Sequence, residues 1–81
     1  MTNRYGIATN YASGLRYWVE VDATGDIIRA RYCMPVAGDK ASQLQHPSHI
    51  AAMLNNGDAE EPAKTARHLM RCSPVYVEIA A

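Results

Sequence analysis

The stretch RYWVEVDATGDIIRARY, residues 16–32, decides the fold. Tyr17, Val19 and Val21 alternate with more polar residues, so they share one face of a strand, because successive strand side chains point to opposite faces. The segment DATG, residues 22–25, then supplies a turn, since glycine accepts the positive φ that such a turn requires. A second strand-like run follows the turn. The stretch therefore predicts a β-hairpin.

Two registers of this hairpin compete. A three-residue loop pairs Asp22 with Asp26 and suits the glycine turn, but it scatters apolar side chains over both faces. A four-residue loop pairs Asp22 with Ile27 and gathers the apolar side chains on one face. We favour the second register, because a slip of one residue inverts every side chain. It sets Trp18 opposite Arg31 and Glu20 opposite Arg29 on one face, and on the other face Val21 opposite Ile28, Val19 opposite Ala30, Tyr17 opposite Tyr32 and Leu15 opposite Met34.

The rest of the chain supplies further strands and two helices. Apolar residues recur at helical spacing after Pro47, which suits a first helical turn, and again after Asp58, which suits a helix cap. Gly57 provides a stop between the two helices. The predicted strands cover about residues 3–11, 15–22, 26–34 and 75–79, and the helical stripes consist of Ile50, Met53 and Leu54 in the first helix and of Ala59, Ala63, Ala66, Leu69 and Met70 in the second.

These elements predict a single α+β domain over residues 1–81, with the order βββααβ. A meander and a C-terminal strand form a three- to four-stranded antiparallel sheet, and both helices pack on one face of it. We expect the helices to cover the face of Tyr17, Val19 and Val21. The opposite face, which carries the charged residues of the hairpin, is then left to solvent.

Trp18, the single tryptophan, lies on that charged face among arginines. An exposed tryptophan beside arginine has the composition of a protein-binding hot spot, and we predict that Trp18→Ala weakens binding with little change in thermal stability. Two structural alternatives compete: a cation–π contact with Arg31, or burial under the connection of residues 35–46. The candidate partner-binding residues are Trp18, Arg16, Arg29, Arg31, Tyr32 and Tyr76.

Composition narrows the class of partner. Eight Lys and Arg side chains balance eight Asp and Glu side chains, which argues against tight binding to DNA and against acidic mimicry of DNA. Acidic residues interleaved with the arginines also weaken an alternative in which bases stack on the same face. No apolar run is long enough to span a membrane and the N-terminus lacks a signal-peptide core, so a cytoplasmic location is expected.

Catalytic and metal sites find little support. His68 and Cys72 lie four apart on one helix and with Cys33 could in principle hold zinc, but no CxxC motif accompanies them. We interpret both cysteines as buried thiols, and a disulfide between them is not favoured in a reducing compartment. No phosphate-binding loop, dinucleotide fingerprint or zinc-protease motif is present. We therefore predict no enzyme activity, no metal and no cofactor.

The segment YWVEVDATGDIIRARY (residues 17–32), followed by a helix and then by CSPVYVEI (residues 72–79), resembles the layout of small phage-encoded anti-CRISPR proteins that act on type I surveillance complexes. The resemblance covers under a third of the chain and includes no signature motif. It implies a stoichiometric inhibitor that docks on a Cas subunit or its nucleic-acid groove. The neutral charge departs from acidic members that imitate DNA, so docking through the Trp18 face is favoured.

The leading hypothesis is therefore a non-enzymatic protein-binding module, a phage or mobile-element inhibitor of a host defence complex. One alternative is a nucleic-acid-binding module that uses the same face. Another is a structural homodimer, in which two sheets pair through Trp18 or edge to edge through the last strand.

Overall fold

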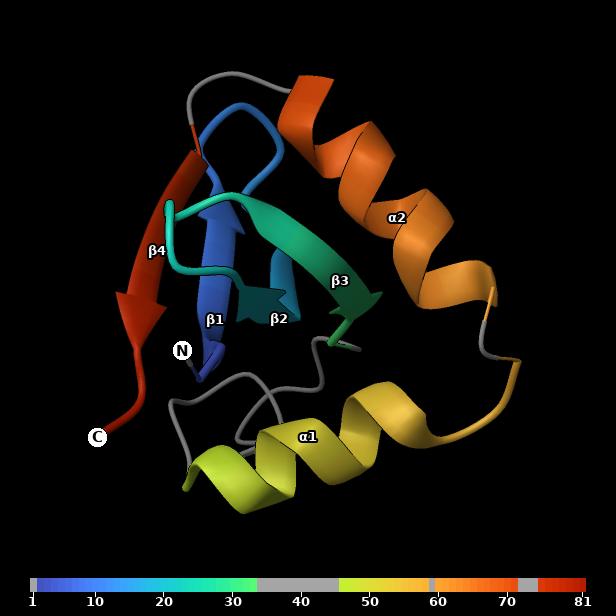
Figure 1. Ribbon diagram of the computed structural model, residues 1–81. Coiled ribbons are helices and arrows are strands. Elements are labelled where there is room, and N and C mark those ends of the chain that lie inside the picture. The colour runs from blue at the N-terminus through green and yellow to red at the C-terminus, as the bar shows by residue number, and fades with distance from the viewer. Residues whose placement is uncertain (1, 34–45, 59, 72–74) are drawn as a thin grey trace.

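The computed structural model describes residues 2–33, 46–58, 60–71 and 75–81 (Figure 1). The observed order βββααβ and the α+β class confirm the sequence prediction. The elements are β1 (Arg4–Asn10), β2 (Arg16–Val21), β3 (Ile27–Tyr32), α1 (Pro47–Asn55), α2 (Glu60–Arg71) and β4 (Val75–Ile79).

The strands form one antiparallel sheet in the order β3-β2-β1-β4. The C-terminal strand therefore joins the meander beside β1, and β2 lies in the interior of the sheet. Gly6 of β1 is required for this arrangement, because a Cβ atom there would collide with the backbone carbonyl of Glu78 in β4. The close approach of β1 and β4 thus depends on a residue without a side chain.

The β2–β3 hairpin combines the two registers that competed at the sequence level. The backbone N–H of Asp22 donates to the carbonyl of Asp26 at 3.0 Å, and Gly25 has a φ of 90°, as the three-residue loop requires. A bulge between Glu20 and Val21 then shifts the pairing by one residue, so that Val21 lies opposite Ile27 and not opposite Ile28.

Beyond the bulge, the favoured register holds. The pairs of Trp18 with Arg31, Glu20 with Arg29, Val19 with Ala30 and Tyr17 with Tyr32 are all observed. Because of the bulge, the hairpin can have the three-residue glycine turn and still keep the apolar side chains of both strands on one face. Ile28 is left unpaired at the bulge and its side chain is exposed. The predicted pair of Leu15 with Met34, the connection of residues 35–45 and Cys72 lie outside the described residues.

Both helices begin, and α1 ends, where local chemistry predicts. His46 caps α1 by accepting from the N–H of Ser48, Pro47 stands in the first turn, and Gly57 follows the helix with a φ of 87°. The Asp58 side chain accepts from the N–H of Glu60 at 2.9 Å and so caps α2. Ala66 and Leu69 are buried as predicted, but Met70 is exposed, contrary to the prediction.

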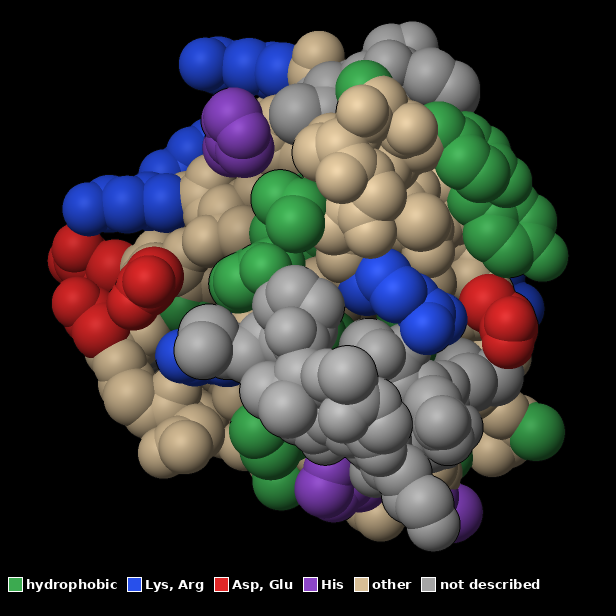
Figure 2. Space-filling model, turned by 180° about the vertical axis from the view of Figure 1, so that it is seen from behind, with side chains coloured by type: hydrophobic (Ala, Val, Ile, Leu, Met, Phe, Trp, Pro, Cys, Tyr) green, Lys and Arg blue, Asp and Glu red, His purple; other side chains and the backbone are tan. Residues whose placement is uncertain are grey.

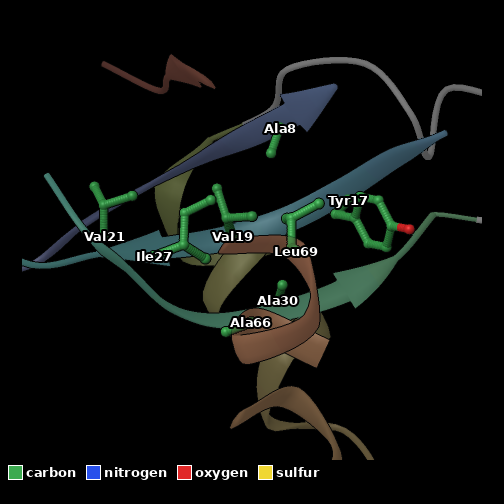
Figure 3. Packing of buried hydrophobic residues seen from close by; sticks show 8 residues of the cluster. All are labelled: Ala8, Tyr17, Val19, Val21, Ile27, Ala30, Ala66 and Leu69. Carbon is green, nitrogen blue, oxygen red and sulfur yellow. The ribbon is translucent and has the colours of Figure 1, made fainter. Parts of the chain in front are cut away.

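The two helices cover opposite faces of the sheet, which corrects the prediction that both lie on one face. Ala66 and Leu69 of α2 point toward the sheet face of Val19 and Ala30 (Figure 3). Ile50 and Leu54 of α1 pack against the other face, next to Ile7 and Trp18. The α2-side core contains Ala8, Tyr17, Val19, Val21, Ile27, Ala30, Ala66 and Leu69, and the α1-side core contains Ile7, Trp18, Cys33, Ile50, Leu54 and Ala80.

Candidate functional site

Trp18 is buried, with only 5% of its surface exposed, and this overturns its predicted role as an exposed docking anchor. It lies in the α1-side core with Ile50 and Leu54 of α1. The indole N–H has no hydrogen-bond partner within the described part of the chain, so Trp18 contributes through packing. A large aromatic side chain on the charged face of β2 is explained by the helix that covers it.

Arg29 takes part in a polar link between the sheet and α1. Its Nε donates to Oε1 of the buried Glu20 at 2.5 Å, and its Nη1 donates to Oδ1 of Asn55 at 2.6 Å. The other oxygen of Glu20 accepts from Nδ2 of Asn3 at 2.8 Å. The buried carboxylate is therefore satisfied from two sides, as a charge at such a position requires.

Arg31 belongs to the same link. Its Nη2 donates to the backbone carbonyl of Asn56, the C-cap residue of α1. The carbonyl groups at the C-terminus of a helix lack partners within the helix, and a guanidinium group is a favourable donor for them. Arg29 and Arg31 thus hold the end of α1 against β3.

Tyr32 lies on the opposite side of the sheet from the other candidates. Its ring centroid is 5.8 Å from that of Tyr17, and it packs at the margin of the α2-side core. It cannot contribute to the same surface as Tyr76, whose cross-strand partner Thr9 lies beside Arg16. The structure therefore separates the six predicted residues into two faces.

Tyr76 is the predicted site residue that the structure places most openly on the surface, with 54% of its surface exposed. Its ring centroid lies 6.4 Å from that of Tyr11, which is 62% exposed. Seen from behind, hydrophobic side chains gather at the margin of the molecule on the side of β4, next to acidic and basic side chains (Figure 2). Two tyrosine rings in contact and largely in water are an exposed apolar feature of the kind that marks binding surfaces.

Strand pairing places Arg16 in the same row as this aromatic pair. Thr9 pairs with Arg16 on one side and with Tyr76 on the other, so the three residues lie across β2, β1 and β4 on one face. Arg16 is half-buried. We call Thr9, Tyr11, Arg16 and Tyr76 the tyrosine surface. Tyrosine and arginine are the residue types most enriched in energetically important protein contacts, together with tryptophan.

Tyr11 was not among the candidates, and its position explains why. It follows β1 by one residue, so the alternation of the strand places it on the face of Thr9. Its contact with Tyr76 depends on the pairing of β4 with β1. The sequence did not indicate which strand of the sheet β4 would pair with. A local pattern could therefore give the face of Tyr11 but not its partner.

The remaining polar features of the described residues lie in turns and at helix ends. Within the described residues there is no pocket and no group of three His, Cys, Asp or Glu side chains that could hold a metal ion. The hydroxyl group of Thr24 donates to Oδ1 of Asp22 at 2.6 Å and, with backbone N–H groups of the same turn, lowers the pKa of Asp22 below its ordinary value, although partial desolvation opposes this shift. That carboxylate organises the β2–β3 turn.

No protein-family model, curated protein or solved structure matches this chain. The resemblance to anti-CRISPR proteins therefore stays a prediction. Neither helix in the described ranges is long and apolar enough to cross a membrane.

Proposed function

We propose that this protein is a non-enzymatic protein-binding module that docks through the tyrosine surface. The observation that supports the proposal is the contact between two largely exposed rings, Tyr11 and Tyr76, in the same cross-strand row as the half-buried Arg16. Exposed aromatic side chains lose little conformational freedom on binding and bring a large apolar area, which is why such groups anchor protein interfaces. Their burial by a partner would supply the driving force.

The balance of charge favours a protein partner over nucleic acid. The chain has no net charge, and the exposed Glu78 follows Tyr76 by two positions on the same face of β4. A nucleic-acid surface would need an excess of cations to release counterions from phosphates. A mixed surface of tyrosine, arginine and glutamate suits another protein.

The specific form of the proposal follows the resemblance described above. The partner is a subunit of a type I CRISPR surveillance complex, bound stoichiometrically in the cytoplasm of a host cell, and the module blocks it without chemistry. Docking through tyrosines at the β1–β4 end of the sheet replaces the Trp18-centred contact that the sequence suggested.

The test measures binding to purified type I surveillance complexes by biolayer interferometry, with the wild type, Tyr11→Ala, Tyr76→Ala and Met70→Ala. Loss of a hot-spot tyrosine weakens binding by about thirtyfold, which corresponds to about 2 kcal/mol. Met70, on α2, is the matched control, because it is an exposed apolar side chain away from the tyrosine surface. All variants should unfold at nearly the wild-type temperature.

Three results would overturn the proposal. Equal binding by the wild type and both tyrosine variants would exclude this surface, and absence of binding to every complex tested would exclude the CRISPR partner. Tight binding to a single-stranded oligonucleotide, with a steep loss of affinity in salt, would replace the protein partner by a nucleic acid.

A further inference from the structure

Within the described residues, the outer edge of β4 is not paired with another strand. β4 is an outermost strand of the sheet, and no described helix or strand lies beyond it (Figure 1). Ala80 donates its N–H to the carbonyl of Tyr5 in a direction toward β1. Backbone groups alternate in direction along a strand, so the N–H and C=O groups of Tyr76 and Glu78 also point toward β1. The N–H and C=O groups of Val75, Val77 and Ile79 point away from β1.

The two edges of the sheet differ in their protection. The other edge strand, β3, carries Arg29 and Arg31, and α2 packs along it. β4 contains one charged residue, Glu78, and no proline or lysine. Natural proteins usually blunt an open edge with charges, prolines or a covering element, so a lightly protected edge points to a strand that pairs.

We propose that β4 pairs antiparallel with β4 of a second copy of this chain, around a twofold axis at Val77. An antiparallel partner must place outward-facing residues opposite one another. The register centred on Val77 does so for all three outward residues, with Val75 opposite Ile79 of the second copy and Val77 opposite itself. It is also the register that uses the full length of the strand. The result is a continuous eight-stranded sheet across the dimer.

The side chains of β4 are self-complementary in this register. Val75, Val77 and Ile79 are half-buried at the flank of the α2-side core, and the same apolar stripe of the second copy would continue it. On the other face Tyr76 lies opposite Glu78 of the second copy, so no two like charges are directly opposed. A second copy therefore satisfies backbone groups, apolar area and charge at once.

This dimer is independent of the partner named above. The twofold axis is perpendicular to the sheet, so equivalent faces of the two copies lie on the same side of the joined sheet. The two tyrosine surfaces therefore lie on one side of the dimer. Tyr11 lies beyond the end of β1 and forms none of the backbone pairs of the β4 contact, although its ring lies against Tyr76. Tyr11→Ala should thus impair docking to a partner and leave dimerisation unchanged, which separates failure of one proposal from failure of the other.

The decisive experiment introduces a negative or a positive charge at position 76 and measures dimer formation by sedimentation velocity over a range of protein concentrations. The wild type should reach twice the 8.9 kDa mass of one chain as concentration rises. In Tyr76→Glu, each introduced carboxylate lies opposite Glu78 of the other copy, and the dimer should dissociate at least about tenfold more readily than in Tyr76→Lys, where the same positions attract. Both changes replace the same exposed side chain, so their effects on the single chain are matched.

Hydrogen exchange of backbone amides gives a second readout. The amides of Val75, Val77 and Ile79 should exchange more slowly as concentration rises, while those of Tyr76 and Glu78, already bonded to β1, should not change. A protein that stays monomeric at several hundred micromolar would overturn the proposal. A dimer that is indifferent to the charge at Tyr76, or that protects other amides, would overturn the β4 contact.

Discussion

The two faces of the sheet are both covered, yet they are covered by different chemistry. On the α2 side, Val19, Ala30 and Leu69 meet in a core of aliphatic side chains and one tyrosine, Tyr17 (Figure 3). On the α1 side, Trp18 packs against the helix while Glu20, Arg29 and Arg31 bind one another or the helix end. Charged residues on a strand thus do not imply an exposed face when they can pair with each other and with the carbonyl groups at a helix terminus.

The largest expected effect tests the buried state of Trp18. Trp18→Ala should lower the free energy of unfolding by about 3–5 kcal/mol, because it leaves a large cavity beneath α1. Denaturation in urea measures the loss. Trp18→Phe is the control and should lose less, since most of the packing remains and the indole N–H has no described partner. A change below about 1 kcal/mol for Trp18→Ala would restore the exposed face that the charge pattern suggested.

The next effect concerns the aliphatic face. Leu69→Ala should cost about 3 kcal/mol, because Leu69 is fully buried between α2 and the sheet. Met70→Ala, on the same helix but exposed, is the matched control and should change stability by less than about 0.5 kcal/mol. If Leu69→Ala proved as mild as Met70→Ala, the covering of this face by α2 would be wrong.

A smaller effect is expected from the polar link of the α1 side. Glu20→Gln should destabilise the fold by about 1–2 kcal/mol, because it weakens the charge-assisted bond from Arg29 in a buried position. Lys64→Gln removes an exposed ion pair in which Nζ of Lys64 lies 3.9 Å from Oε2 of Glu60. Its loss should lower the free energy of unfolding by less than about 0.5 kcal/mol. Comparable losses for the two variants would show that the Glu20–Arg29 contact is as solvated as a surface pair.

The smallest effect lies in the turn that joins β2 to β3. Thr24→Val removes the hydroxyl donor and should raise the pKa of Asp22 toward its ordinary value, as an NMR titration of the carboxyl group measures. A lowered pKa in the folded state favours the carboxylate, so its stabilising contribution is present above about pH 4 and is lost as the pH falls through the folded pKa. The variant should therefore lose less stability on acidification than the wild type. An unchanged pKa in Thr24→Val would assign the shift to the backbone N–H groups instead.

Local pattern was sufficient for much of the hairpin. The alternation along β2 gave the correct cross-strand neighbours for Tyr17 and Val19, since the pairing of one strand fixes which residues share a face, but Val21 lies opposite Ile27 and not opposite Ile28 as predicted. The turn demanded one register and the apolar face another, and the bulge at Glu20 and Val21 accommodates both. A bulge has no distinct local signature, so the competing patterns were visible from the sequence but their joint solution was not.

The candidate site was less accessible to the same reasoning. Trp18, Arg29 and Arg31 lie on one face as predicted, but α1 covers that part of the face. Trp18 packs against α1, and the two arginines donate hydrogen bonds to residues at its C-terminal end. The pairing of Tyr11 with Tyr76 required knowledge that β4 joins β1. Contacts between segments far apart in sequence carry no periodic signal, and they decided which aromatic side chains reach solvent.

The sequence by itself determined the number, kind and order of the elements, the turn at residues 22–25, the cap at Asp58 and which strand residues share a face. Those features depend on side chains within a few positions of each other. Only the tertiary structure decided that the helices lie on opposite sides of the sheet and that β4 pairs with β1. The apolar stripe of α1 can cover either face, and the choice follows from the burial of Trp18 together with the pairing of charges around it.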